Sequence, residues 1–134
     1  MKRIIVAAAF ALTTVMAFSA NAGNILMPAK VVDRDDHSQA YWCQAEDMEH
    51  NVCATVQVSD DLQHILIKDV PGMACADNNF GVIGTQTGVG ENIQYDGGDC
   101  EGGVEARFVR GTQNNQLYVQ VYKGKKIFGN YPVH

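Results

Sequence analysis

The residues best placed to do chemistry lie at positions 94–103, where the sequence reads QYDGGDCEGG. Three acids, Asp96, Asp99 and Glu101, share this stretch with four glycines and Cys100. A calcium-binding EF-hand needs acids at alternating positions, a glycine at the sixth and a glutamate at the twelfth, and the spacing here differs. A phosphate-binding glycine loop opens a helix, whereas these glycines lead into the strand-like sequence VEARF. The pattern therefore favours a turn fastened by a disulfide, and it predicts no metal or other cofactor.

No pairing of a nucleophile with a base stands out elsewhere. The serines Ser38 and Ser59 lie in no Gly-x-Ser-x-Gly elbow. The histidines match no His-Glu-x-x-His zinc motif; they are His37, His50, His64 and His134. The many acids could include a glycosidase pair, but such a pair is defined only by its spacing in three dimensions. We therefore expect a non-catalytic protein, with a small cell-wall or saccharide hydrolase using paired carboxylates as an alternative.

The cysteines predict two disulfides. An even number of cysteines in an exported chain indicates disulfide pairing, and here they are Cys43, Cys53, Cys75 and Cys100. Their spacing opposes a zinc site, because no Cys-x-x-Cys pair is present. Three connectivities are possible for four cysteines. We favour Cys43–Cys53 and Cys75–Cys100, because each bond then closes its own loop and stabilises the fold by about 3 kcal/mol in the chain-entropy model.

The first 22 residues have the three-part pattern of a bacterial signal peptide. Lys2 and Arg3 are followed by a largely apolar stretch at 4–18 and by the cleavage site Ala-Asn-Ala at 20–22. The apolar stretch is shorter than the roughly 20 residues that cross a bilayer. Cleavage after Ala22 would leave a single exported domain, residues 23–134, in the periplasm or outside the cell.

Export also makes the chain more acidic. The full sequence has 10 basic and 15 acidic residues, and loss of Lys2 and Arg3 changes its net charge from −5 to −7. Nucleic acids and anionic membranes bind basic surfaces, so both are excluded as expected partners. The expected partner is therefore a protein or a saccharide, and the negative net charge favours a basic protein.

Secondary structure is predicted to be β almost throughout. Apolar and polar residues alternate at 52–58, 104–110 and 117–123, and β-branched residues between turn signals fill 62–70. Further strand candidates lie at 29–33, 40–45, 80–85, 91–95 and 126–131, with one helical turn at 45–51 and a loosely held arm at 23–39. About eight short strands without crossover helices imply antiparallel pairing. We expect an all-β fold, a small antiparallel β-barrel, with a two-sheet β-sandwich as the alternative.

Two clusters of side chains could form a binding surface. Tyr118, Gln120 and Tyr122 share one face of a predicted strand, and Phe128 follows on the next. If exposed, this face is an aromatic platform suited to a protein or a sugar. The basic residues gather separately, at Lys123, Lys125 and Lys126 with Arg107 and Arg110 on a neighbouring strand.

The glycine-rich segment 84–103 is predicted to protrude as a loop or short hairpin that contacts the partner. Seven of its twenty residues are glycine, and few are large and apolar. Shortening Thr87–Glu91 is then expected to abolish binding and leave the thermal midpoint nearly unchanged. The candidate binding residues, from this segment and the aromatic platform, are Glu91, Tyr95, Asp96, Asp99, Glu101, Tyr118 and Tyr122.

One resemblance to a known family concerns the sequence TGVGENIQYDGG at 87–98. It resembles the stretch of small residues and tyrosine in the loops of periplasmic inhibitors of animal-type lysozymes. Those inhibitors are small, exported, disulfide-bearing antiparallel barrels, and an acidic exported barrel suits a basic enzyme as its target. The resemblance covers about a dozen residues and implies an inhibitor, without assigning a role to any single residue.

Overall fold

The computed structural model describes residues 28, 31–37, 39–40, 43, 45–50, 53–69 and 74–134. The predicted signal peptide at 1–22 lies outside these residues. Within the described part of the chain, no helix is long and apolar enough to cross a membrane.

Among the described residues, strands make up nearly all of the regular structure, together with one short helix, α2 (Ala45–Glu49). The strands are β1 (Val31–Asp33), β2 (Gln39–Ala40), β3 (Cys53–Val58), β4 (His64–Asp69), β5 (Asn79–Gly84), β6 (Val89–Ile93), β7 (Glu105–Arg110), β8 (Leu117–Lys123) and β9 (Lys126–Pro132). The predicted all-β class is therefore confirmed, and so is the helical turn between Cys43 and Cys53.

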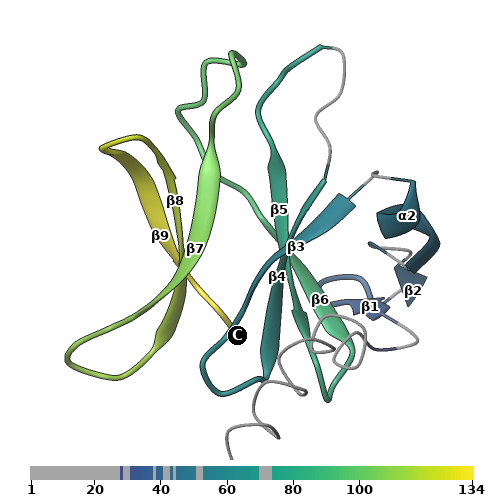
Figure 1. Cartoon of the computed structure of the whole chain (residues 1–134). Helices are drawn as coiled ribbons and strands as arrows, with labels where there is room; N and C mark the ends of the chain where they lie inside the picture. Colours follow the sequence, from purple (N-terminus) through teal and green to yellow (C-terminus); the bar gives the residue numbers. More distant parts are fainter. Residues whose placement is uncertain are drawn as a thin grey trace, which may run out of the picture.

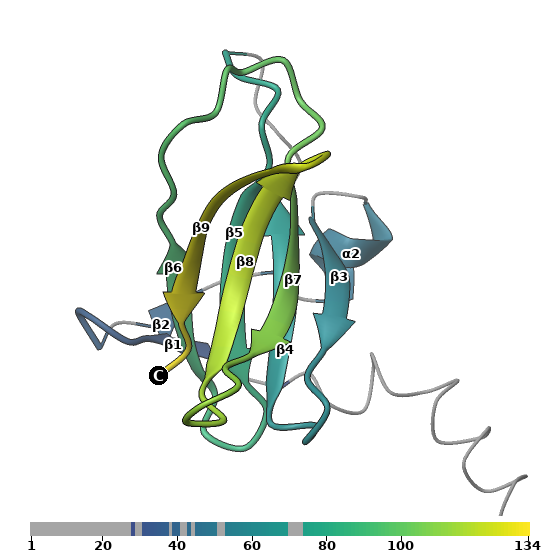
Figure 2. The ribbon, with the colours of Figure 1, turned by 90° about the vertical axis from the view of Figure 1, so that its left-hand side faces the viewer.

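The described strands form two sheets. A six-stranded sheet has the order β2-β1-β6-β5-β4-β3, and a three-stranded sheet has the order β7-β8-β9. Figure 1 shows the smaller sheet beside the larger one, and the view in Figure 2 looks across the smaller sheet onto β4 and β5. Antiparallel pairing holds for every described pair except β1 and β6, which are parallel. That exception corrects the expectation, and it arises because the long connection between β1 and β6 allows a crossover.

The inner faces of the two sheets share one hydrophobic core. The six-stranded sheet contributes Leu66, Phe80, Val82 and Ile93, and the smaller sheet with its flanking residues contributes Val104, Ala106, Leu117, Val119, Val121 and Val133. A second cluster covers the other face of the large sheet; it contains Val31, Cys43, Cys53, Ile65, Ile67 and Ile83, with Met48 of α2 packed against it. Both faces of β4 are thus buried, which explains its continuous apolar run.

The alternation predicted for 117–123 is confirmed in β8. Leu117, Val119 and Val121 of β8 are buried, and the residues between them are only half-buried. Asn115 and Gly124 have positive φ angles of 55° and 59° at the two hairpin turns, where asparagine and glycine are the favoured residues.

Two other expectations about strands are wrong. The alternation expected at 52–58 is interrupted, because the register of β3 against β4 shifts between Thr55 and Gln57. The arm expected at 23–39 includes β1, whose Val31 is fully buried in the second cluster.

Both predicted disulfides are confirmed. Cys43 bonds to Cys53 with a Cα–Cα distance of 5.6 Å, and Cys75 bonds to Cys100 with a Cα–Cα distance of 4.5 Å. Both distances lie within the range of ordinary disulfides, roughly 4.4–6.8 Å. The first bond joins the segment before α2 to β3, and the second joins the segment before β5 to the glycine-rich loop.

The shared core predicts a contrast between two leucines. Leu66 is fully buried between the sheets, whereas Leu62, in the turn before β4, is 39% exposed. Leu66→Ala should lower the free energy of unfolding by about 2–5 kcal/mol, because it leaves a cavity between the sheets. Leu62→Ala should change it by no more than about 0.5 kcal/mol. Urea denaturation of both variants is the measurement, and similar effects at the two positions would contradict the packing.

Candidate functional site

The segment expected to protrude is divided between a strand and a loop. Its first half contains β6, which pairs with β5 on one side and with β1 on the other. Because β6 is interior to the sheet and Ile93 is in the core, the expectation that 84–103 protrudes as a whole is wrong for 89–93. Shortening Thr87–Glu91 would remove part of this sheet. Residues 94–104 do form an irregular connection, which lies at one end of the strands beyond β6 (Figure 1).

A cleft of about 790 Å³ opens between this connection and the segment that precedes β5. We call it the acidic cleft, because three carboxylates line it, those of Asp69, Asp77 and Asp96, and no basic residue does so in the described part of the chain. The other lining residues are Ala74, Cys75, Asn79, Phe80, Asn92, Ile93, Gln94, Tyr95, Gly97, Gly98 and Cys100. The cleft therefore combines negative charge with amide groups and two aromatic rings.

Asp77 holds the connection 94–104, which forms one wall of the acidic cleft. It is only 8% exposed. Its Oδ2 accepts a hydrogen bond from the backbone N–H of Cys100, and its Oδ1 accepts one from that of Gly102, both at 3.0 Å. Hydrogen bonds to a charged group are stronger than those between neutral groups. One buried carboxylate thus holds two backbone amides of the connection 94–104.

The Cys75–Cys100 disulfide acts at the same place as Asp77. The backbone N–H of Ala76 also donates to the carbonyl of Cys100, at 3.0 Å. A Cβ at Gly98 would overlap the Asp77 carboxylate, which explains why glycine is required there. The interpretation of this stretch as a turn fastened by a disulfide is therefore confirmed.

Tyr95 provides a third anchor. Its hydroxyl donates to the backbone carbonyl of Asn78 at 2.7 Å. Its ring stacks on Phe128 of β9 with a centroid distance of 5.9 Å and lies 6.0 Å from the ring of Phe80. Burial, and then the negative charge of Asp77, raise the pKa of Tyr95. The tyrosine therefore connects the loop to both sheets.

The acids of the site differ in their partners. Partial burial raises the pKa of Asp69, and the charge of Asp47 raises it further. Asp99 instead forms an ion pair with Lys123 at 3.1 Å and accepts a hydrogen bond from the backbone N–H of Glu101. Its pKa is lowered, first by the Glu101 amide and then by Lys123. Asp99 thus joins the loop to β8, and Asp96 is exposed at the rim of the cleft.

The structure brings together only some of the predicted binding residues. Tyr95, Asp96, Asp99 and Glu101 lie in one loop. Glu91 lies on β6, where it pairs with Arg34 at 3.2 Å and accepts the backbone N–H of His134.

The predicted aromatic platform faces away from the core, on the outer side of the small sheet. The Arg107 guanidinium lies 4.5 Å from the centroid of the Tyr122 ring, so one face of that ring is already covered. Arg107 also donates to Gln120, which in turn donates to Asn130. The grouping of Phe128 with this platform is wrong, because Phe128 packs against the core and Tyr95. The register of β8 against β9 shifts between Val121 and Tyr122, and this irregularity accompanies the turn of Phe128 toward the core.

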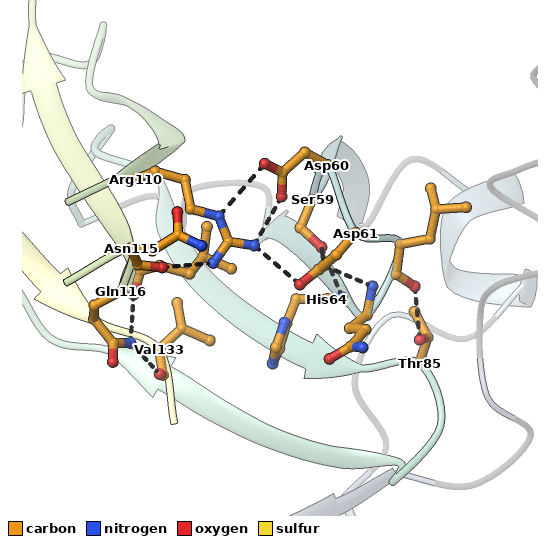
Figure 3. Close-up of polar contacts among 12 residues, drawn as sticks. Ser59, Asp60, Asp61, His64, Thr85, Arg110, Asn115, Gln116 and Val133 are labelled. Carbon is orange, nitrogen blue, oxygen red and sulfur yellow. Dashed lines mark hydrogen bonds and ion pairs between the residues drawn. The ribbon is translucent and has the colours of Figure 1, made fainter. Parts of the chain in front are cut away.

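Two residues of the predicted basic cluster, Lys123 and Arg110, form ion pairs within the molecule. Lys123 forms an ion pair with Asp99 in the connection 94–104. Arg110 lies at the opposite end of the strands, where it forms ion pairs with Asp60 at 2.8 Å and Asp61 at 2.9 Å and donates to the carbonyl of Asn115 (Figure 3). Asp61 also accepts from the Ser59 hydroxyl. These contacts tie the β3–β4 turn to the β7–β8 turn across the two sheets.

A metal site among the cysteines is not available in the oxidised chain. Ligand atoms of Cys75, Asp77 and Cys100 lie within 4.8 Å of one another. The two sulfurs are bonded to each other, and zinc needs free thiolates. Both oxygens of Asp77 accept amide hydrogen bonds. The group therefore acts as a structural brace.

Sequence reasoning missed Asp69 and Asp77. Asp77 follows Cys75 by two residues, and the predicted Cys75–Cys100 bond would have placed it near the glycine-rich stretch. Asp69 ends a predicted strand, and nothing in the sequence indicates that the chain folds it toward Asp96.

Comparisons with known proteins give no relatives. No family model matches the chain, and neither the curated proteins nor the solved structures yield a match. The function must therefore be argued from the geometry of the site.

The anchoring role of Asp77 can be tested by substitution. Asp77→Ala should lower the free energy of unfolding by about 2–4 kcal/mol, because two amides lose a charged acceptor. Amide exchange at Cys100 and Gly102 should become faster. The matched control is Asp96→Ala in the same loop, which is exposed and should change stability by at most about 0.5 kcal/mol. Unchanged exchange at both amides in Asp77→Ala would show that another group holds the loop.

The contacts of Asp61 predict a loss of stability in acid. Hydrogen bonds from Ser59 and the Gln63 amide lower the pKa of Asp61 from 3.8 to about 2, and Arg110 lowers it as well. A carboxylate with a lowered pKa stabilises the fold above its unfolded pKa, so this contribution should be lost as the pH falls from about 4 toward 2. In denaturation measured at about pH 6 and pH 3, Asp61→Asn should lose less stability than the wild type. Glu105→Gln, at an exposed position on β7, should lose as much as the wild type.

Proposed function

We propose that the mature domain is a non-catalytic, exported binding module that accepts a basic group of a partner protein in the acidic cleft. The observation that carries the proposal is the lining of the cleft, in which Asp69, Asp77 and Asp96 meet no basic residue of the described chain. The raised pKa of Asp69 reflects burial and a neighbouring negative charge. A cation bound beside Asp69 would offset both effects, because an opposite charge favours the charged form of the carboxylate.

The rigidity of the cleft wall supports binding. Ordering a flexible loop on a partner costs free energy, and a loop that is already fixed avoids that cost. The connection 94–104 is held by the Cys75–Cys100 disulfide, by Asp77 and by Tyr95. The role predicted for Asp96 at the partner's basic groups fits its exposure at the rim.

Inhibition of a basic enzyme is the most specific form of this function. A net charge of −7 after removal of the signal peptide would speed encounters with a basic partner. The resemblance of 87–98 to inhibitors of animal-type lysozymes suggests one such target. Two disulfides also fit an oxidising compartment such as the periplasm or the extracellular space.

A hydrolase with paired carboxylates is the second candidate, because Asp69 has a raised pKa in a cleft. General acids in glycosidases have this property. The geometry favours binding over hydrolysis, because both carboxylate oxygens of the neighbouring Asp77 accept hydrogen bonds from backbone amides, which hold it in place.

For the architecture, we propose an open sandwich of two sheets in place of the closed barrel that the sequence favoured. The adjacent edges of β3 and β7 are joined by a side chain, because the Phe108 N–H donates to Gln57 Oε1 at 2.9 Å. A closed barrel would have a backbone ladder there.

Binding to the acidic cleft can be tested with an animal-type lysozyme as the basic probe. Calorimetric titration of the disulfide-bonded domain should give binding that weakens as salt is raised. The double variant Asp69→Asn with Asp96→Asn should bind about tenfold more weakly or worse, a loss of roughly 1.4 kcal/mol.

Two controls make this experiment decisive. Succinylated lysozyme carries negative charges in place of its lysine ammonium groups and should bind much more weakly. Tyr118→Ala, on the outer face of the small sheet, should bind like the wild type. Weaker binding in Tyr118→Ala with normal binding in the acid variant would place the partner on the aromatic platform. Release of reducing sugar from cell walls, abolished by Asp69→Asn, would favour the hydrolase.

A further inference from the structure

The two disulfides differ in their surroundings. Cys43 and Cys53 are each 3% exposed and belong to the second hydrophobic cluster. Cys100 is exposed, Cys75 is half-buried, and both of them line the acidic cleft. Exposed disulfides are reduced more easily than buried ones. A reductant in solution therefore reaches the Cys75–Cys100 bond first.

The backbone keeps Cys75 and Cys100 together without the help of their bond. The Ala76 N–H donates to the Cys100 carbonyl at 3.0 Å. The Asp77 carboxylate accepts the N–H of Cys100 and that of Gly102, each also at 3.0 Å. None of these hydrogen bonds involves a sulfur atom, so reduction of the disulfide breaks none of them. The two Cα atoms, which are 4.5 Å apart, then carry two free thiols side by side.

Asp77 adds a carboxylate to these two sulfurs. The sulfur atoms of Cys75 and Cys100 and a carboxylate oxygen of Asp77 lie within 4.8 Å of one another. A tetrahedral zinc ion, with Zn–S distances of about 2.3 Å and a Zn–O distance of about 2.0–2.2 Å, holds such ligand atoms roughly 3.5–3.8 Å apart. Once the disulfide is broken, rotation of the two cysteine side chains brings the sulfurs to this spacing.

We propose that Cys75, Asp77 and Cys100 form a zinc site when their disulfide is reduced. Thiolate ligands select zinc, whereas calcium and magnesium bind oxygen ligands. No fourth thiol, imidazole or carboxylate of the described chain joins the group, so water completes the tetrahedron. The ion enters through the acidic cleft, where the charges of Asp69 and Asp96 attract it. The site is independent of the function proposed above, because it needs no partner protein.

The hydrogen bonds of Asp77 suit it to the role of a ligand. A carboxylate offers about four lone-pair positions, and the two backbone amides occupy one position on each oxygen. Carboxylates that bind metals are themselves held by hydrogen bonds of this kind, which orient them toward the ion. The two amides that Asp77 braces in the oxidised chain therefore orient it toward zinc in the reduced chain.

The change between the two forms is a two-electron reaction. A dithiol attacks the Cys75–Cys100 bond, gives two electrons and two protons to the cysteine sulfurs, and becomes a disulfide itself. Zinc then binds both cysteines as thiolates and releases the two protons, while its own oxidation state does not change. Zinc binding should therefore weaken as the pH falls.

The test uses the mature domain, with zinc ions as the probe. A phosphine replaces the dithiol, because it supplies no thiol that competes for zinc. Alkylation followed by mass spectrometry should find Cys75 and Cys100 free and the buried disulfide intact. The reduced domain should bind one zinc ion at least about a hundredfold more tightly than the oxidised domain. X-ray absorption should show two sulfur ligands at about 2.3 Å and oxygen ligands at about 2.0–2.2 Å.

Two aspartates close to Cys100 in the fold give a matched comparison. Asp77→Asn should weaken zinc binding by about tenfold to a hundredfold. Asp99→Asn removes the same charge from a residue that pairs with Lys123, and it should weaken zinc binding by at most about fivefold, the effect of an exposed charge. In case Asp77→Asn does not fold, carbon NMR of the reduced wild type replaces it. Zinc should then shift the carboxyl resonance of Asp77 more than that of Asp99.

Four results would overturn the proposal. The first is equal reduction of both disulfides by the phosphine. The second is zinc binding that is no tighter in the reduced domain than in the oxidised one. The third is a zinc ion with fewer than two sulfur ligands. The fourth is an equal effect at Asp77 and Asp99, in affinity or in the carboxyl resonances.

Discussion

Apolar contact between the inner faces of the two sheets is the constraint on which the rest of the molecule depends. No backbone ladder joins the described strands of one sheet to those of the other, so the shared core must hold them together. Polar side chains then fix their alignment at the margins. Arg110 joins the turns at one end, Gln57 joins two edges, and the loop between β6 and β7 crosses the other end. Each candidate binding feature lies where this alignment leaves the sheets incompletely covered.

Much of the fold could be predicted from local patterns. Alternation in 104–110 and 117–123 identified the hairpin that became β7 and β8, and sequence proximity identified both disulfides. The parallel pairing of β1 with β6 could not be predicted, because it joins residues far apart in sequence. The burial of β6 was missed for a related reason. Its glycines indicated a loop, whereas Gly90 is buried in a strand that pairs on both sides.

The candidate site was predicted only where the chain itself carried the signal. Cys100 and its glycines identified the loop, and the acids beside them indicated its charge. Asp69 and Asp77 come from other segments, and their approach depends on how β4 ends and β5 begins beside the loop. The same applies to the partners that Asp99 and Glu91 find in Lys123 and Arg34. Sequence spacing identifies the acidic residues, but only the fold decides which of their charges are already neutralised.

The position of the Cys75–Cys100 bond has a consequence for when the protein matures. The bond lies in the wall of the acidic cleft and outside the core that joins the sheets. A freshly synthesised chain with free thiols could therefore form its sheets before that wall is fixed. Oxidation would then complete the cleft as a separate step, after the sheets have assembled. In such a chain, oxidation would add a covalent anchor to a loop that Asp77 and Tyr95 already hold, so the rigidity of the cleft wall would depend on the redox state of its surroundings.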